Sequence, residues 1–189
     1  MNIVNFKNHL LISTQKLSNS FFYRTVIYIY KDNNFKINGV IINKKIKNLT
    51  VKSFLKKTNI KIMKKKFLNK INNPIILGGL KEKNKGLVIH CFKKIFLSNI
   101  YVSPSVSITK SKDILKYLKK KKHFKKMLII LGHCSWKKKE LEKEIYNNNW
   151  LLTLSNKNIL FNISIKNKWE KSMKKIGIKN FHNLIIKNG

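Results

Sequence analysis

The chain has 189 residues, and its 42 Lys and Arg residues against seven Asp and Glu residues give a formal net charge of +35. A hydrophobic fraction of 43% in a chain of this length allows one sizeable core and excludes a disordered basic tail. Two cysteines exclude a disulfide framework, and no apolar run reaches the ~20 residues that a membrane helix needs. We therefore expect a single domain over residues 1–189, soluble, cytoplasmic and without a secretory signal.

The lysine excess has two interpretations. It could serve nucleic-acid binding, or it could reflect an AT-rich genome that has filled the solvated surface with lysine. Ala is absent, Ile, Lys and Asn make up about half of the chain, and Arg24 is the single arginine. Arginine makes the bidentate contacts to phosphate and guanine, so its near absence favours the second interpretation. Weak, non-specific polyanion binding is expected in either case.

The first half of the chain alternates short β-rich runs with polar stretches. Runs of β-branched and aromatic residues predict strands at His9–Ser13, Val26–Tyr30, Val40–Ile42, Pro74–Leu77 and Leu87–His90. Val51–Lys57 is typical of one or two helical turns. The stretch Lys61–Asn73 is rich in Lys and Asn and is expected to be an exposed insert.

In the second half, strands are predicted at Ile100–Val102, Val106–Ile108, Met127–Leu131 and Trp150–Leu154. The uninterrupted apolar run at Met127–Leu131 indicates an interior strand. Apolar spacing predicts helices at Lys112–Leu118, Trp136–Tyr146 and Lys166–Lys175, the last closed by Gly177. Lys119–Lys126 is expected to be an exposed linker. This mixture of elements predicts an α+β protein with a mixed sheet and helices packed on it.

The segment Leu131–Trp136 is the first candidate for function. We interpret it as a buried strand, a tight turn at Gly132 and a helix that begins at once. The free N–H groups of a helix start bind anions, so we hypothesise a ligand site formed by Gly132, His133 and Ser135. Arg24 would supply a guanidinium suited to a carboxylate or phosphate.

A structural alternative for the same residues stays open. Ser135 could cap the helix, Trp136 could fill the core, and Arg24 could pair with Glu142 or Glu144 far from any pocket. Only a structure can separate this alternative from a ligand site.

Other residue patterns carry weaker signals. Glu140 and Glu144 lie four residues apart on one helix face and could form a partner surface or pair with neighbouring lysines. Gly78 and Gly79 indicate a turn that needs positive φ. The two His–Cys pairs, His90–Cys91 and His133–Cys134, fit no familiar zinc spacing. We expect neither a metal nor a cofactor.

Several segments occur in an order that resembles the AlgH/YqgE family of bacterial proteins. The similar segments are His9–Ser13, Phe22–Val26, Gly39–Lys44, Pro74–Gly79, Lys85–His90, Thr109–Leu115, Leu131–Trp136, Glu140–Ile145, Asn149–Leu151, Trp169 and Ile176–Ile178. Cys134 stands where the family usually has a small residue, which argues against a nucleophile at this position.

The resemblance implies an α+β fold with a mixed, bifurcated, partly barrel-like β-sheet surrounded by helices. It implies a cytoplasmic bacterial protein, and a transcription-related regulatory role has been attached to one branch of the family. It implies no reaction, because the family has no agreed catalytic residues. Accordingly, no catalytic residue is assigned.

Three functions follow as expectations. The first is a non-enzymatic regulatory or interaction protein that binds a protein partner or a small anionic ligand. The second is a hydrolase built on the Gly132–Ser135 turn, which requires His133 to reach Ser135 or Cys134. The third is a weak, lysine-driven nucleic-acid binder. Whether the protein is an enzyme is not decided by the sequence, and no membrane partner is expected.

Overall fold

The computed structural model of the chain describes residues 5–57, 73–91, 96–111, 113–114 and 126–179. Three expectations fall largely outside these residues. They are the exposed insert at Lys61–Asn73, of which Asn73 is described, the helix at Lys112–Leu118, and the linker at Lys119–Lys126, of which Lys126 is described.

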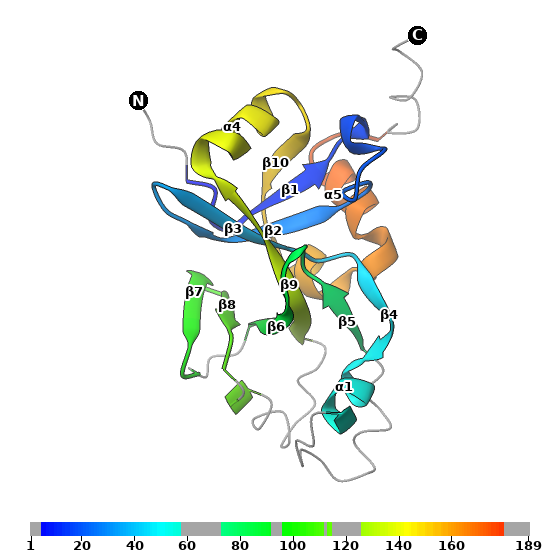
Figure 1. Ribbon diagram of the computed structural model, residues 1–189. Helices are drawn as coiled ribbons and strands as arrows, with labels where there is room; N and C mark the ends of the chain where they lie inside the picture. The colour runs from blue at the N-terminus through cyan, green and yellow to red at the C-terminus, as the bar shows by residue number, and fades with distance from the viewer. Residues whose placement is uncertain (1–4, 58–72, 92–95, 112, 115–125, 180–189) are drawn as a thin grey trace.

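Ten strands in the described residues form one strongly curled sheet (Figure 1). They are β1 His9–Ser13, β2 Val26–Asp32, β3 Lys36–Ile41, β4 Lys45–Thr50, β5 Pro74–Leu77, β6 Lys81–His90, β7 Asn99–Ser103, β8 Val106–Thr109, β9 Met127–Lys137 and β10 Trp150–Leu154. Every strand predicted from the sequence is confirmed. Strand β4 is not predicted from the sequence, because four of its six residues are polar; it lies off the main strand order and pairs with β5.

Short helices cover the sheet. They are α1 Val51–Lys57, α4 Lys138–Tyr146, α5 Lys168–Lys175, the 3₁₀ turns η1 Gln15–Leu17 and η5 Ile165–Asn167, and the π-helical turn η4 Asn158–Asn162. The predicted end of the last helix is confirmed in detail. Gly177 has φ +86°, its N–H bonds the Lys174 carbonyl, and the Ile178 N–H bonds the Met173 carbonyl. These two hydrogen bonds form a Schellman motif, which satisfies carbonyls that the helix leaves unpaired.

The sheet is mixed and bifurcated, as expected. Strand β9 lies in its interior and pairs with β6 along one edge. Along its other edge β9 pairs first with β5, in parallel, through Ile130 and Leu131. From Cys134 onward the same edge pairs with β3, in antiparallel fashion. The change of partner between Leu131 and Cys134 is the fork of the sheet.

Three apolar clusters form the core. The first lies between the curled sheet and the η4–α5 segment and includes Tyr28, Ile130 and Trp169. The second lies beside α1, and the third packs α4 against β2, β3 and β10 through Trp136 and Trp150. All three tryptophans are buried, as predicted from their size. No helix in the described part of the chain is both long and apolar enough to cross a membrane.

One predicted boundary is wrong. Strand β9 does not end at Leu131 but runs on to Lys137, and helix α4 begins at Lys138 instead of Trp136. The reason is a burial pattern with a period of two, in which Cys134 and Trp136 face the core while Ser135 between them is half-buried. This alternation is typical of a strand.

Candidate functional site

The fork of the sheet depends on the close approach of two glycine segments. The Gly78 N–H donates to the Leu131 carbonyl at 2.7 Å, and the Gly78 carbonyl accepts from the Ile41 N–H at 2.8 Å. A Cβ on Gly78 would lie 2.4 Å from the Gly132 carbonyl oxygen. Gly132 itself has φ +76° and lies against the backbone carbonyl of Gly79. Glycine is therefore required here for structural reasons. The positive φ predicted for the Gly78–Gly79 turn is found at Gly79, and Gly132 has a positive φ as well.

Gly132 also faces an interruption in the neighbouring strand. Lys81 pairs with His133 and Gly86 pairs with Leu131, so residues 82–85 of β6 have only Gly132 opposite them. The ladder is broken there, and this bulge brings the Glu82 side chain beside His133.

The anion-binding turn predicted at Gly132–Trp136 is absent, because these residues continue β9. Ser135 pairs with Asn38 across the sheet and caps no helix. The start of α4 is closed by other groups. The Lys137 N–H donates to the Glu140 carboxylate at 3.0 Å, and the Lys138 N–H donates to the Phe35 carbonyl at 3.2 Å. The free N–H groups that motivated the anion site are therefore not at Gly132–Ser135.

His133 nevertheless occupies a charged position. Its Nδ1 lies 3.6 Å from a Glu82 carboxylate oxygen, and its side chain is only 14% exposed. Burial lowers the pKa of His133, Glu82 raises it, and the positive charges of Lys110, Lys36 and Lys81 lower it further. Lys36 begins β3, Lys81 begins β6, and Lys110 directly follows β8.

Cys134 and Ser135 do not form a catalytic arrangement with His133. The Cys134 thiol points to the opposite face of β9 and donates to the Gly78 carbonyl at 3.5 Å. Burial raises the pKa of this thiol to about 12, so it stays protonated at neutral pH. No hydrogen bond joins His133 to Ser135 or to Cys134 within the part of the chain that the structure describes.

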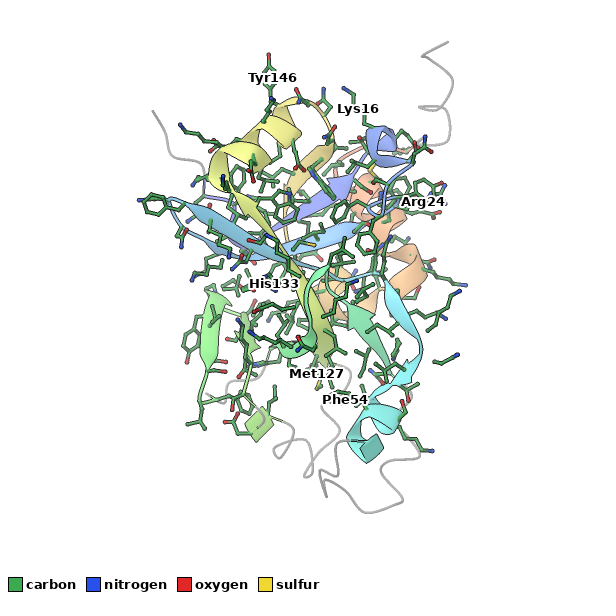
Figure 2. All side chains as sticks on the ribbon, in the orientation of Figure 1. Lys16, Arg24, Phe54, Met127, His133 and Tyr146 are labelled. Carbon is green, nitrogen blue, oxygen red and sulfur yellow. The ribbon has the colours of Figure 1, made fainter. Side chains whose placement is uncertain are left out.

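Arg24 lies at a different place in the molecule from His133, as Figure 2 shows. Its guanidinium carbon lies 5.1 Å from the ring centroid of Trp169 and 5.5 Å from that of Tyr23. A planar guanidinium stacks on aromatic rings better than an ammonium does, which gives this arginine a structural role. The suggestion that it brings charge to the Gly132–Ser135 segment is therefore wrong.

The suggested pairing of Arg24 with Glu142 or Glu144 is not observed either. The Glu144 carboxylate instead accepts a hydrogen bond of 2.6 Å from the Trp150 indole. Glu140 binds the start of its own helix, and its ion pair with Lys137 is exposed at 3.9 Å. Glu140 and Glu144 therefore have separate local partners, and their role as a partner surface stays a prediction.

The two His–Cys pairs are not brought together. His90 pairs with Met127 at one end of the β6–β9 ladder, and His133 pairs with Lys81 at the other. Six residues of extended strand separate these positions by roughly 20 Å. Among the residues that the structure describes, no group of three or more His, Cys, Asp or Glu side chains could hold a metal ion.

Two features of the structure are not predicted from the sequence. Asn43 accepts from the Val26 N–H at 2.9 Å and donates to the Arg24 carbonyl at 2.8 Å, so it holds the loop before β2. Lys168 is 1% exposed and lies beside a pocket of about 530 Å³. In so lysine-rich a chain, the sequence does not distinguish Lys168 from an exposed lysine. Asn43 and Lys44 belong to the Gly39–Lys44 segment that resembles the family, and this was the signal available for Asn43.

Comparisons with known proteins agree with this architecture. The family model described as AlgH-like matches residues 10–180. A UPF0301 protein of Buchnera aphidicola subsp. Baizongia pistaciae is 43% identical over 187 residues, which cover 99% of this chain and 98% of the relative. A UPF0301 protein of Hamiltonella defensa is 37% identical and covers 95% of this chain and 96% of its own length.

Two solved structures share the fold. The solution structure of the AlgH protein from Pseudomonas aeruginosa has a TM-score of 0.74 at 23% identity and covers 100% of this chain and 99% of its own. A crystal structure of a protein from Corynebacterium diphtheriae has a TM-score of 0.70 at 13% identity and covers 96% and 93%. The two likenesses concern the fold, while the sequence matches establish descent. The chain belongs to the AlgH-like family.

Proposed function

We propose that this protein is a non-enzymatic interaction protein that binds an acidic segment of a protein partner at the surface around His133. The observation that carries the proposal is that the positive charges of Lys36, Lys81 and Lys110, from three separate segments of the chain, all act on His133. Regulation through such a complex, including regulation of transcription, is the biological role that the proposal implies.

The composition of this surface favours a patterned partner over a polyanion. Glu82 lies within it and also binds Lys85 at 2.5 Å. A carboxylate among the lysines repels a uniformly charged phosphate backbone but tolerates a segment whose acidic residues are spaced to avoid it. The exposed side chain of Leu80, next to Lys81, adds an apolar contact of the kind that protein interfaces use.

The hydrolase alternative receives no support from the geometry, because the Cys134 thiol faces the core and Ser135 does not bond His133. A nucleophile needs its base within hydrogen-bond reach. The lysine-driven nucleic-acid alternative is left as an outcome of the test.

The test uses a fluorescent acidic peptide and a single-stranded oligonucleotide of equal charge. Replacing Lys36, Lys81 and Lys110 with Gln should weaken peptide binding at least tenfold at physiological salt. A matched control replaces three exposed lysines of the η4–α5 region, Lys157, Lys171 and Lys174, and should change binding less than twofold. Both variants lose the same charge, so only a specific surface separates them.

Two results would overturn the proposal. Equal losses in the two triple variants would show general attraction to a basic protein. Tighter binding of the oligonucleotide than of the peptide, with the same loss on substitution, would assign this surface to nucleic acid.

A further inference from the structure

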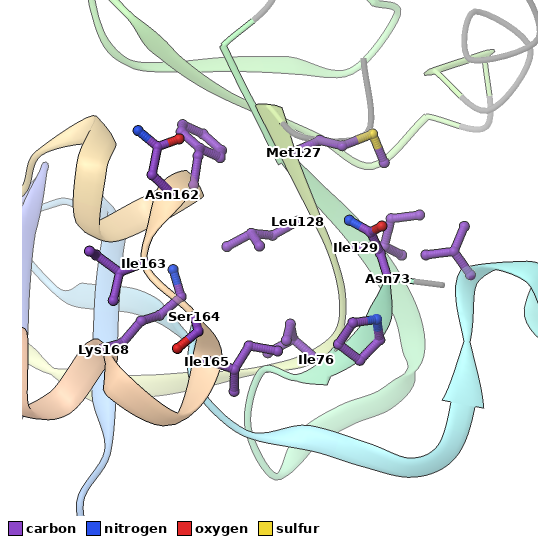
Figure 3. A pocket seen from close by; sticks show the side chains of 13 residues that line it. Asn73, Ile76, Met127, Leu128, Ile129, Asn162, Ile163, Ser164, Ile165 and Lys168 are labelled. Carbon is purple, nitrogen blue, oxygen red and sulfur yellow. The ribbon is translucent and has the colours of Figure 1, made fainter. Parts of the chain in front are cut away.

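A pocket of about 530 Å³ lies between the first half of β9, the start of β5 and the η4–η5–α5 segment (Figure 3). Nine of its 13 lining residues are apolar, and they come from both sides of the pocket. These are Val51, Pro74, Ile76, Met127, Leu128, Ile129, Phe161, Ile163 and Ile165. The four polar ones are Asn73, Asn162, Ser164 and Lys168. Lys168 is the only titratable side chain among these 13.

Lys168 extends from α5 toward Leu128, as Figure 3 shows. Its ammonium donates to the carbonyl of Ile159 and, at 2.6 Å, to the carbonyl of Leu160. An ammonium has three N–H donors, so these two bonds leave one for another acceptor. Burial lowers the pKa of this amine to about 8, which keeps most of it charged at neutral pH.

Lys168 has no carboxylate partner among the residues that the structure describes. All seven Asp and Glu residues belong to the described part, and none forms an ion pair with it. A buried charge without a counter-charge is costly, and two neutral carbonyls offset this cost only in part. The pocket therefore presents an apolar wall together with an uncompensated positive charge.

We propose that this pocket binds a small carboxylate with an apolar body, such as a medium-chain fatty acid. Its carboxylate would accept from the remaining N–H of Lys168, and its chain would pack on Ile76, Leu128 and Ile129. Asn162 and Ser164 add polar side chains to the lining of the same pocket. A charge-assisted hydrogen bond in an apolar setting fixes such a ligand in one orientation. None of the lining residues belongs to the surface around His133, so this site is independent of the proposed function.

A purely structural role for Lys168 makes a different prediction. In that case the amine only ties α5 to the carbonyls of η4, and the pocket has no preference for an anion. Decanoate, 1-decanol and acetate are probes that separate the two roles. Decanoate supplies the whole ligand, 1-decanol supplies the apolar chain without the charge, and acetate supplies the charge without the chain.

Titration calorimetry on the full chain should show saturable binding of one decanoate, with 1-decanol and acetate at least tenfold weaker. Lys168→Met should weaken decanoate binding at least tenfold. Lys171→Met is the matched control, because Lys171 is exposed on the same helix and its loss changes the net charge equally. It should stay within twofold of wild type.

A second variant keeps the test decisive if Lys168→Met does not fold. Ile163→Trp leaves the lysine in place and narrows the pocket, so it should also weaken decanoate binding at least tenfold. Absence of saturable decanoate binding to wild type overturns the proposal. So does binding that Ile163→Trp leaves unchanged, or that Lys168→Met and Lys171→Met weaken equally, because both results indicate adsorption to the lysine-rich surface.

Discussion

Two lysines begin two helices of this protein, and their surroundings differ. Lys138 is the first residue of α4, and its side chain is 12% exposed. Its ammonium lies 3.3 Å from the carboxylate of Asp32, which is 2% exposed. Lys168 is the first residue of α5, is more deeply buried, and bonds only backbone carbonyls. A cation at a helix start opposes the helix dipole, so both lysines need compensation from elsewhere.

The two lysines therefore differ in role. The charge of Lys138 belongs to a structural ion pair, whereas the charge of Lys168 is available to a ligand. Asp32 balances Lys138 and also accepts from the Phe6 N–H at 2.7 Å, so this ion pair fastens the start of the chain to α4. Lys168 has hydrogen bonds but no balancing Asp or Glu side chain in the described part of the chain, and it borders a pocket. With 42 basic and seven acidic residues, most lysines must stay in water. A lysine buried without a carboxylate is therefore the exception that points to a ligand.

The largest effect is expected when the balanced pair is broken. Asp32→Asn leaves the Lys138 charge nearly buried and weakens the bond to the Phe6 N–H. Removing one partner of a buried ion pair costs about 3 kcal/mol of unfolding free energy. Urea unfolding would measure it, with the exposed carboxylate variant Glu142→Gln as a control that should change stability by less than about 0.5 kcal/mol. A loss below about 1 kcal/mol would show that Asp32 is not what balances Lys138.

The second effect is a pH dependence specific to Lys168. Its pKa is lowered from 10.5 to about 8, so above pH 8 the unfolded chain binds more protons than the folded one. Stability from this group therefore rises as the pH increases from 8 toward 10.5, while below pH 8 the cost of the buried charge is fully present. Between about pH 7.5 and about pH 10, wild type should gain roughly 2 kcal/mol relative to Lys168→Met.

Using the difference between wild type and variant removes the contribution of groups that both proteins share. Cys134 is the main one up to pH 10, because burial raises its pKa from 9.0 to about 12 and so lowers stability above pH 9 in both chains. Parallel stability curves for the two proteins would mean that Lys168 has an ordinary pKa.

The third effect is the stability change in Lys168→Met itself at neutral pH. The variant loses two charge-assisted hydrogen bonds but no longer buries a charge, and the two contributions oppose each other. We expect a net loss of about 1 kcal/mol, well below that of Asp32→Asn. Thermal and urea unfolding of both variants in one buffer would establish the order. The reverse order would contradict the distinction between a balanced and an unbalanced lysine.

Much of the fold was predictable because runs of apolar, β-branched and aromatic residues report directly on strands. Met127–Leu131, Pro74–Leu77 and Trp150–Leu154 were placed in this way, and the family resemblance supplied the curled, forked sheet. The sequence places the start of α4 too early, because a glycine after an apolar run is typical of the end of a strand. In fact Gly132 is a positive-φ position inside β9, where another backbone segment approaches too closely for any side chain.

The candidate site was less accessible to prediction, because it depends on contacts between distant segments. The nearness of Glu82 to His133 results from a break in the β6–β9 ladder that no local pattern announces. Arg24 is unusual in the sequence as the single arginine, but its guanidinium contacts the rings of Tyr23 and of Trp169, and Trp169 is far along the chain. The role of Lys168 depends on where every carboxylate lies, which only the structure establishes.

The smallest effect concerns His133, whose compensation by a carboxylate is intermediate between that of Lys138 and that of Lys168. The Glu82 carboxylate lies nearby, but Glu82 is 41% exposed and also forms an ion pair with Lys85. Burial lowers the pKa of His133 from 6.5, so acidification below 6.5 should protonate the unfolded chain first and reduce stability as the pH falls through the folded-state value. Glu82 opposes this shift, so Glu82→Gln should lower the pKa of His133 further. A ring-proton NMR titration would show the change, and Glu142→Gln, with the same loss of charge on α4, should leave the curve in place. If Glu82→Gln raises the pKa of His133 or leaves it unchanged, Glu82 is not its electrostatic partner, and the surface around His133 is more uniformly positive than the structure indicates.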